Sequence, residues 1–145
     1  MISTKIAETV AELDDCYRVR TEVFVNEQGV PADIERDELD ATAVHVLATA
    51  NGCSVGAARV VRLDDGTSAK IGRVAVLQSA RGLGIGTMLM AAIEAAPELS
   101  SCERFVLQSQ THAMPFYAKL GFAAYGDEFQ EAGIPHIAMS KGRRR

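Results

Sequence analysis

The segment with the clearest chemical potential is the glycine-rich run Arg81-Gly82-Leu83-Gly84-Ile85-Gly86. It follows a β-rich stretch and precedes a helical pattern, so its glycines would form a turn from a strand into a helix. Glycine lets the backbone approach a ligand closely. A helix N-terminus offers unpaired N–H groups and about half a positive charge, and Arg81 adds a cation. The run therefore predicts a phosphate or pyrophosphate site, with a tightly packed structural turn as the alternative.

The glycine spacing distinguishes this run from two common phosphate-binding motifs. A dinucleotide-binding G-x-G-x-x-G would need glycine where Thr87 stands. The P-loop pattern also fails, because the chain contains no Gly-Lys-Ser/Thr. An antiparallel pattern before the run disagrees with a leading βαβ unit as well. We therefore expect a phosphate-bearing ligand bound by neither of these two motifs.

Other ionisable residues could supply charge or accept a proton. One acidic stretch contains Glu35, Asp37, Glu38 and Asp40. These carboxylates would make a neighbouring pocket negative, which suits a cationic ligand; the alternative is a solvated run of charges. The histidines are His45, His112 and His136. A histidine on a strand is more often structural, so the sequence identifies no general base.

The cysteines do not indicate a metal site. Cys16, Cys53 and Cys102 form no C-x-x-C pair. We expect three small apolar residues in the core and no bound metal.

Apolar periodicity and turn signals predict the elements that position these residues. Strands are expected over residues 3–8, 44–49, 54–63, 69–77, 105–107, 122–125 and 134–140, and helices over about 10–25, 85–96 and 114–120. A capping box at Thr9 and Glu12 begins the first helix. Asn51-Gly52 predicts a hairpin. Residues 26–40 are expected to be a loop, with room for a short helical turn.

Composition indicates one ordinary domain over residues 1–145. Hydrophobic residues make up 48% and charged residues 23%, as in globular proteins. The net charge is −4, and 12 cations face 19 carboxylates once the terminal Arg143, Arg144 and Arg145 are set aside. We therefore expect no nucleic-acid partner, and a disordered basic tail over 143–145. No apolar run could span a membrane and residues 1–10 lack a signal-peptide core, so we expect a cytoplasmic protein with no membrane partner.

The chemistry-bearing motifs, taken together, resemble those of the GNAT N-acetyltransferase superfamily. Arg81, Gly84 and Gly86 fill its acyl-CoA signature, Q/R-x-x-G-x-G/A. The preceding residues 73–77 are similar to its splayed central strand, and residues 116–122 are similar to its F-Y-x-x-x-G-F segment. Gln110 stands where the family usually has Asn, which keeps an amide there. Residues 20–28 and 133–139 further resemble the ElaA-like branch, so the likeness covers nearly the whole chain.

The resemblance implies a fold and a reaction. The fold would be α+β: a mostly antiparallel, twisted sheet of six to seven strands, flanked by about four helices, with a splayed central strand that holds acyl-CoA. The reaction would be N-acetyl transfer from acetyl-CoA to a primary amine of a small molecule or peptide, by an acyltransferase that transfers groups other than aminoacyl groups. No metal is implied, and the protein would be a monomer or homodimer.

The resemblance also assigns roles to individual residues. Residues 81–86 would bind the pyrophosphate, and Val74, Ala75 and Val76 would pair with the pantetheine arm as an added strand. The Val76 N–H would donate to the thioester oxygen. Tyr117 would protonate the departing thiolate, since a thiol pKa of about 8.5 and a phenol pKa of about 10 are close enough for transfer. The residues expected near the acceptor are Glu35, Asp37, His45 and His136.

Two other functions are compatible with the same residues. A non-catalytic acyl-CoA-binding regulatory domain would bind CoA yet release no thiol with any amine. An acyl-homoserine-lactone synthase has a related fold, but it would be longer and would consume S-adenosylmethionine.

Overall fold

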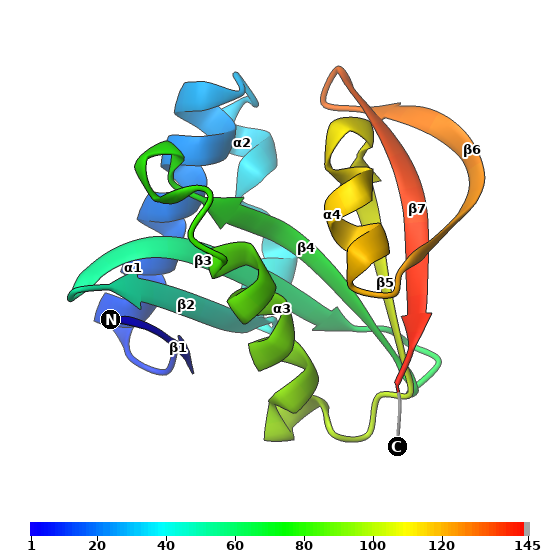
Figure 1. Cartoon of the computed structure of the whole chain (residues 1–145), viewed down its shortest axis with the longest axis horizontal. Helices are drawn as coiled ribbons and strands as arrows, with labels where there is room; N and C mark the ends of the chain where they lie inside the picture. The colour runs from blue at the N-terminus through cyan, green and yellow to red at the C-terminus, as the bar shows by residue number, and fades with distance from the viewer. Residues whose placement is uncertain (144–145) are drawn as a thin grey trace.

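The computed structural model describes residues 1–143, and its centre is a seven-stranded mixed sheet in the order β1-β2-β3-β4-β5-β7-β6 (Figure 1). The strands are β1 (Ile2–Ile6), β2 (Val44–Ala50), β3 (Cys53–Arg62), β4 (Ser68–Val76), β5 (Arg104–Gln110), β6 (Ala123–Glu131) and β7 (Ile134–Gly142). The helices are α1 (Val10–Arg20), α2 (Ala32–Glu35), α3 (Ile85–Ala95) and α4 (Met114–Lys119). This is the α+β fold that the sequence predicts.

The sheet opens between its two central strands. All neighbouring strands are antiparallel except β4 and β5, which pair in parallel. That parallel pairing covers Ser68–Ile71 against Arg104–Leu107 and goes no further. The later residues of β4 and β5 are therefore unpaired with each other, and the two strands diverge in Figure 1.

A bulge in β4 lies where the divergence begins. The register with β3 shifts between Ala57↔Ala75 and Arg59↔Gly72, so β4 carries one extra residue there. Within this bulge Arg73 has φ 53°, which is uncommon for a residue with a side chain. Bulges bend a strand and increase its twist. The bend accounts for β4 turning away from β5 after Ile71.

Helices cover both faces of the sheet (Figure 1). On one face Cys16 and Val19 of α1, with Val23 of the π-helical segment that extends it, pack against Ala57 and Ala75. The larger core lies on the opposite face, where α3 contributes Ile85, Leu89, Met90 and Ile93, all at most 1% exposed. The opening between the diverging parts of β4 and β5, called the splay below, thus lies between two packed layers.

The locally encoded elements form as predicted. Thr9 accepts from the Glu12 N–H and Glu12 accepts from the Thr9 N–H, which completes the capping box. Asn51 and Gly52 both have positive φ, as a two-residue hairpin turn requires. β6 is longer than expected and runs to Glu131. Its side chains are mostly exposed, so it lacks the apolar alternation that reveals a strand.

The expected basic tail does not include Arg143. Its guanidinium donates to the carbonyls of Cys102, Glu94 and Leu99 at 2.7 to 2.9 Å. These carbonyls lie at and beyond the C-terminal end of α3, where a cation is favoured. Arg144 and Arg145, the rest of that expected tail, lie outside the described residues.

Candidate active site

A cavity of about 880 Å³ occupies the splay. The predicted site residues that line it are Glu35, Asp37, Val74, Val76, Arg81, Gln110, Tyr117 and His136. Those outside its lining are Ala75, Gly82, Leu83, Gly84, Ile85, Gly86 and His45. The structure thus brings together residues from both halves of the sheet that are far apart in sequence.

The backbone of β4 explains why Val76, and not Ala75, faces the cavity. The Leu77 N–H donates to the Val55 carbonyl at 2.9 Å. Hydrogen-bonded and non-hydrogen-bonded pairs alternate along an antiparallel ladder, so the neighbouring pair Gly56↔Val76 is a non-hydrogen-bonded one. The Val76 N–H and carbonyl therefore point away from β3 and toward the splay. Ala75 pairs with Ala57 and is buried beneath α1.

The glycine-rich run divides into a turn and a packing contact. Gly82 and Gly84 have φ 84° and 80°, and Gly84 is the N-cap of α3, so these two form the left-handed turn into the helix. Gly86 is already helical, and a Cβ there would lie 3.0 Å from the Phe116 ring. Gly86 therefore lets α3 and α4 pack closely. Ile85 is a core residue at 1% exposure.

Arg81 is already paired in this structure. Its guanidinium forms two 2.7 Å bonds with the Glu27 carboxylate, and its Nε donates to the Val76 carbonyl at 3.0 Å. Glu27 ends the π-helical segment Thr21–Glu27 that extends α1. The cation at the cavity entrance thus has its charge balanced by a carboxylate.

Gln28 spans the splay beside this ion pair. Gln110 donates to the Gln28 side-chain oxygen at 2.8 Å, and Gln28 donates back at 3.5 Å. Two consecutive residues after α1 therefore contact the two sides of the opening. Glu27 pairs with Arg81, which follows β4, and Gln28 bonds Gln110 at the end of β5. These contacts could not be predicted from the sequence, because their partners lie more than fifty residues apart and leave no local pattern.

Tyr117 combines burial with a free hydroxyl. The residue is 9% exposed, and its ring makes edge contacts with Phe116 and Phe122. Its hydroxyl forms no hydrogen bond with any residue of 1–143. Burial raises the pKa of this phenol to about 12. Tyr117 is therefore neutral at ordinary pH and holds a proton in the cavity wall.

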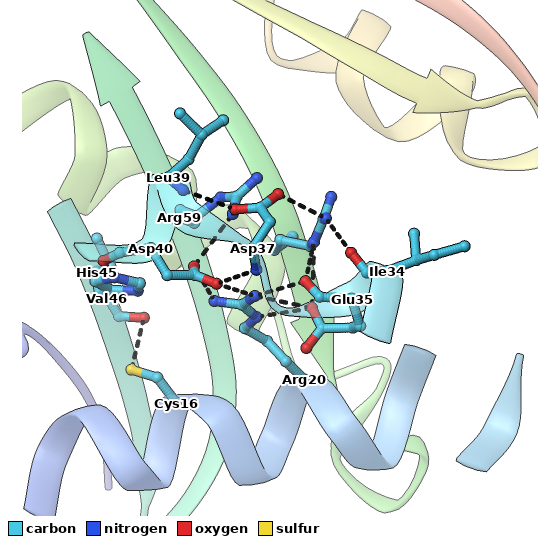
Figure 2. A network of polar contacts seen from close by, with 11 residues as sticks. Cys16, Arg20, Ile34, Glu35, Asp37, Leu39, Asp40, His45, Val46 and Arg59 are labelled. Atoms are coloured by element: carbon cyan, nitrogen blue, oxygen red, sulfur yellow. Dashed lines mark hydrogen bonds and ion pairs between the residues drawn. The ribbon is translucent and has the colours of Figure 1, made fainter. Parts of the chain in front are cut away.

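The acidic stretch belongs to a buried ion network (Figure 2). Arg20 of α1 is fully buried and donates to Glu35 at 2.9 Å and to Asp40 at 2.8 Å. Arg59 of β3 pairs with Asp37 and Asp40, at 2.6 and 3.1 Å. Arg73, in the β4 bulge, pairs with Glu35 and Asp37 at 3.2 and 3.4 Å. Three arginines thus face three carboxylates.

This pairing changes the interpretation of the acidic residues. Burial alone would raise the pKa of Asp40, but hydrogen bonds from Arg20, the Asp37 backbone and Arg59 hold it well below its usual range. Burial opposes the shift in Asp37 too, and Arg59 again lowers the pKa. Asp37 and Asp40 are ionised, and all three carboxylates are matched by guanidinium groups. They hold α1 and α2 to the sheet, and they do not make the pocket negative as expected.

The histidines differ in their surroundings. His45 is 4% exposed, and its Nε2 lies 2.9 Å from the Asp40 carbonyl. Its ring meets Tyr17, and its Nδ1 has no partner among residues 1–143. It is a core residue away from the cavity. His112 and His136 both line the cavity, and His136 is 7% exposed.

Two further observations concern metals and membranes. Within residues 1–143, no three His, Cys, Asp or Glu side chains are grouped as metal ligands would be. No helix in this same part of the chain combines the length and the apolar character needed to cross a bilayer.

Known proteins match this chain over nearly its full length. The family model described as "Acetyltransferase (GNAT) domain" matches residues 11–143. An uncharacterized N-acetyltransferase of Bacillus subtilis, YjcF, is 42% identical over 137 residues, which is 94% of this chain and 96% of the relative.

Solved structures agree with the sequence match. The crystal structure of Escherichia coli ElaA has a TM-score of 0.84 and 30% identity, covering 97% of this chain and 99% of the other. An acyl-CoA N-acyltransferase from Pseudomonas aeruginosa has a TM-score of 0.83 and 34% identity, covering 98% and 99%.

Proposed function

Because this chain belongs to the GNAT acetyltransferase family, we propose that it transfers an acetyl group from acetyl-CoA to a primary amine by direct attack on the thioester. The acceptor would be a small-molecule or peptide amine in the cytoplasm. The observation that carries the proposal is the splayed β4. It directs the Val76 N–H into a cavity whose wall also contains the protonated, unpaired Tyr117.

The donor would bind along β4 and the turn before α3. The Val76 N–H can pair with the pantetheine arm as a neighbouring strand would. The Val76 carbonyl, which accepts from Arg81 Nε in this structure, would become available once Arg81 turns away. The turn at Gly82 and Gly84 leaves the first N–H groups of α3 open for the pyrophosphate. Arg81 would turn from Glu27 toward the same phosphates.

The chemical step would use the backbone and Tyr117. The amine nitrogen forms a bond to the acetyl carbon, and negative charge develops on the thioester oxygen. The Val76 N–H stabilises that charge. The carbon–sulfur bond then breaks, and Tyr117 gives its proton to the departing sulfur. Burial keeps the phenol protonated until the thiolate forms.

A thiol-release assay tests the proposal. Acetyl-CoA is mixed with the protein and a panel of amines, and free CoA and acetylated amine are measured together. We expect equal amounts of both products with at least one amine, and none without an amine. Tight acetyl-CoA binding with no thiol released by any amine would instead indicate a non-catalytic acyl-CoA-binding domain.

A further inference from the structure

The hairpin of β6 and β7 presents two ionisable side chains to the cavity. Its turn consists of Ala132 and Gly133, which have φ 52° and 74°. A turn of two residues with positive φ fixes the register of the strands around it. Glu131 therefore lies opposite Ile134, and Phe129 lies opposite His136. These four side chains share one face of the hairpin, and Glu131, Ile134 and His136 line the cavity.

The protonation of His136 follows from its neighbours. Its Nδ1 lies 2.7 Å from the Ile134 carbonyl. A carbonyl only accepts hydrogen bonds, so Nδ1 carries a hydrogen. In the neutral ring Nε2 is then left with a lone pair. The ring stacks on Phe129 with centroids 5.9 Å apart, which helps to hold this orientation.

Glu131 gives the lone pair a neighbour that also accepts protons. The Nε2 atom lies 3.6 Å from Oε2 of Glu131. Two acceptors this close do not bond to each other in the neutral state. A primary ammonium group has three N–H donors and can satisfy both at once. The pair therefore has the chemistry to bind a protonated primary amine.

We propose that His136 is the general base of the reaction and that Glu131 binds the acceptor's ammonium group beside it; this inference rests on the proposed function. An N–H bond of the ammonium breaks, its proton moves to Nε2, and the freed lone pair attacks the acetyl carbon. Glu131 and the Ile134 carbonyl face the imidazolium that results. The nitrogen loses a second proton once the amide forms, which replaces the proton that Tyr117 gave to sulfur. The imidazolium then returns its proton to water.

The neighbouring histidine provides a matched control. His112 lines the same cavity, but neither of its ring nitrogens bonds to a residue of 1–143. Nothing fixes its tautomer or pairs it with a carboxylate. The assignment thus favours His136 on geometry alone.

The first test uses His136→Asn, whose side-chain N–H₂ can still donate to the Ile134 carbonyl. We expect kcat at neutral pH to fall by about 10² to 10⁴-fold, with acetyl-CoA affinity unchanged by calorimetry. An alkyl amine has a pKa of about 10, so solution supplies neutral amine as the pH rises. The difference in kcat between His136→Asn and the wild type should therefore become smaller at alkaline pH. Glu131→Gln should raise the acceptor's KM more than it lowers kcat. His112→Asn should show no loss of kcat that narrows as the pH rises.

The second test does not depend on activity. Ring-nitrogen chemical shifts of His136, from NMR of the ¹⁵N-labelled protein, should show the Nδ1–H tautomer in the neutral state. Addition of a simple alkyl amine should shift the Nε2 signal of the wild type and leave that of Glu131→Gln unmoved. An Nε2–H tautomer would overturn the proposal.

The outcomes separate this inference from the function beneath it. A wild type that acetylates an amine, with His136→Asn within twofold of it at neutral pH, overturns the base assignment alone. If the loss of kcat in His136→Asn is the same at every pH, His136 has a structural role, and the base assignment is again overturned. A wild type that acetylates no amine in the panel overturns both proposals.

Discussion

Tyr117 lies in an environment that differs strongly from that of an exposed tyrosine. Burial raises its pKa to about 12, while the thiol that it would protonate has a pKa of about 8.5. Transfer to a thiolate is therefore uphill for the tyrosine in the free protein. Bound acyl-CoA would have to supply part of the difference, for example by holding the sulfur within hydrogen-bond reach of the hydroxyl.

Tyr117→Phe measures what this hydroxyl contributes. The ring still fills its place between Phe116 and Phe122, so we expect the fold and acetyl-CoA affinity to survive. Turnover should fall by about 10² to 10⁴-fold. Because the phenol ionises near pH 12, it should cause no loss of wild-type activity below about pH 10. Steady-state rates and calorimetry on the same preparations check this.

A second tyrosine provides the control. Tyr125 lies on β6 and is 47% exposed, outside the cavity lining. Tyr125→Phe should leave turnover within twofold of wild type. If Tyr117→Phe behaves in the same way, Tyr117 is only a packed aromatic residue.

At the scale of residues, the sequence predicts several of the side chains that line the cavity but not the contacts that they make. Arg81, Val76 and Tyr117 line the cavity, in positions that the motifs indicate. Gly84 caps α3, whereas Gly86 packs against a ring. The sequence does not separate these roles, because a glycine that approaches a ligand and a glycine that approaches a side chain look identical in it. Gly86 meets Phe116, which no spacing rule reports. His45 proves to be a core residue for the same reason: its partner is a backbone carbonyl.

Among the elements, the π-helical segment Thr21–Glu27 that extends α1 sets the charge at the cavity entrance. Glu27 neutralises the Arg81 guanidinium that the pyrophosphate would need. In the proposed function, acyl-CoA binding would replace the Arg81–Glu27 ion pair with an Arg81–pyrophosphate pair, so the two anions would compete for one cation. The proposed donor site would therefore couple the helix extension Thr21–Glu27 to acyl-CoA binding, although this segment precedes the acyl-CoA motif by more than fifty residues.

Glu27→Gln should make acetyl-CoA bind more tightly. An ion pair between partly exposed groups contributes about 0.2 to 1 kcal/mol, so removing the competing carboxylate should lower Kd by up to about fivefold. Glu22→Gln is the matched control, since Glu22 is exposed on the same segment and its side chain bonds only Asn26 within residues 1–143. Calorimetry compares the three proteins. A weaker affinity in Glu27→Gln would show that Glu27 positions Arg81 for the ligand.

The ion network joins elements that the sequence presents separately. Its carboxylates lie in one acidic stretch, but Arg20, Arg59 and Arg73 come from α1, β3 and β4. A run of acidic residues read alone resembles a solvated loop, since the pairing exists only after the sheet has formed. Capping boxes and hairpin turns were predictable because both partners lie within a few residues.

Asp40→Asn should destabilise the fold strongly. It weakens the acceptor of two buried guanidinium groups, and breaking a buried ion pair costs about 3 to 5 kcal/mol. Asp33→Asn, an exposed change in α2, should cost far less. Urea unfolding at neutral pH measures both. A loss below about 0.5 kcal/mol in Asp40→Asn would mean that the network contributes little to stability.

The same carboxylate predicts how stability depends on pH. The folded pKa of Asp40 lies below its value of about 4 in an unfolded chain. The contribution of ionised Asp40 to the free energy of unfolding is therefore complete above about pH 4 and is lost as the pH falls through the folded pKa. The wild type should lose more free energy of unfolding between about pH 6 and pH 3 than Asp40→Asn does.

For the molecule as a whole, the splay divides one sheet into two halves. The halves share four parallel residue pairs at one end and the Gln28–Gln110 contact at the other. The number and type of the strands follow from apolar periodicity and turn signals, and so do the approximate limits of all but β5 and β6, which are longer than expected. The divergence of β4 from β5 does not, because it arises from a one-residue register shift at Arg73, a long-range property of strand pairing. Only the resemblance to a known family predicted it.

Acyl-CoA binding along β4 should therefore be visible in the backbone, residue by residue. The Val76 N–H points into the splay and has no β3 partner, whereas the neighbouring Ala75 lies in a pair with Ala57. Amide hydrogen exchange followed by NMR should show faster exchange at Val76 than at Ala75 in the free protein. Saturating acetyl-CoA should slow Val76 strongly, because the ligand would accept its hydrogen bond, and should change Ala75 much less. Uniform slowing of both amides would report only global stabilisation by a ligand bound elsewhere, and an unchanged Val76 would remove β4 from the donor site.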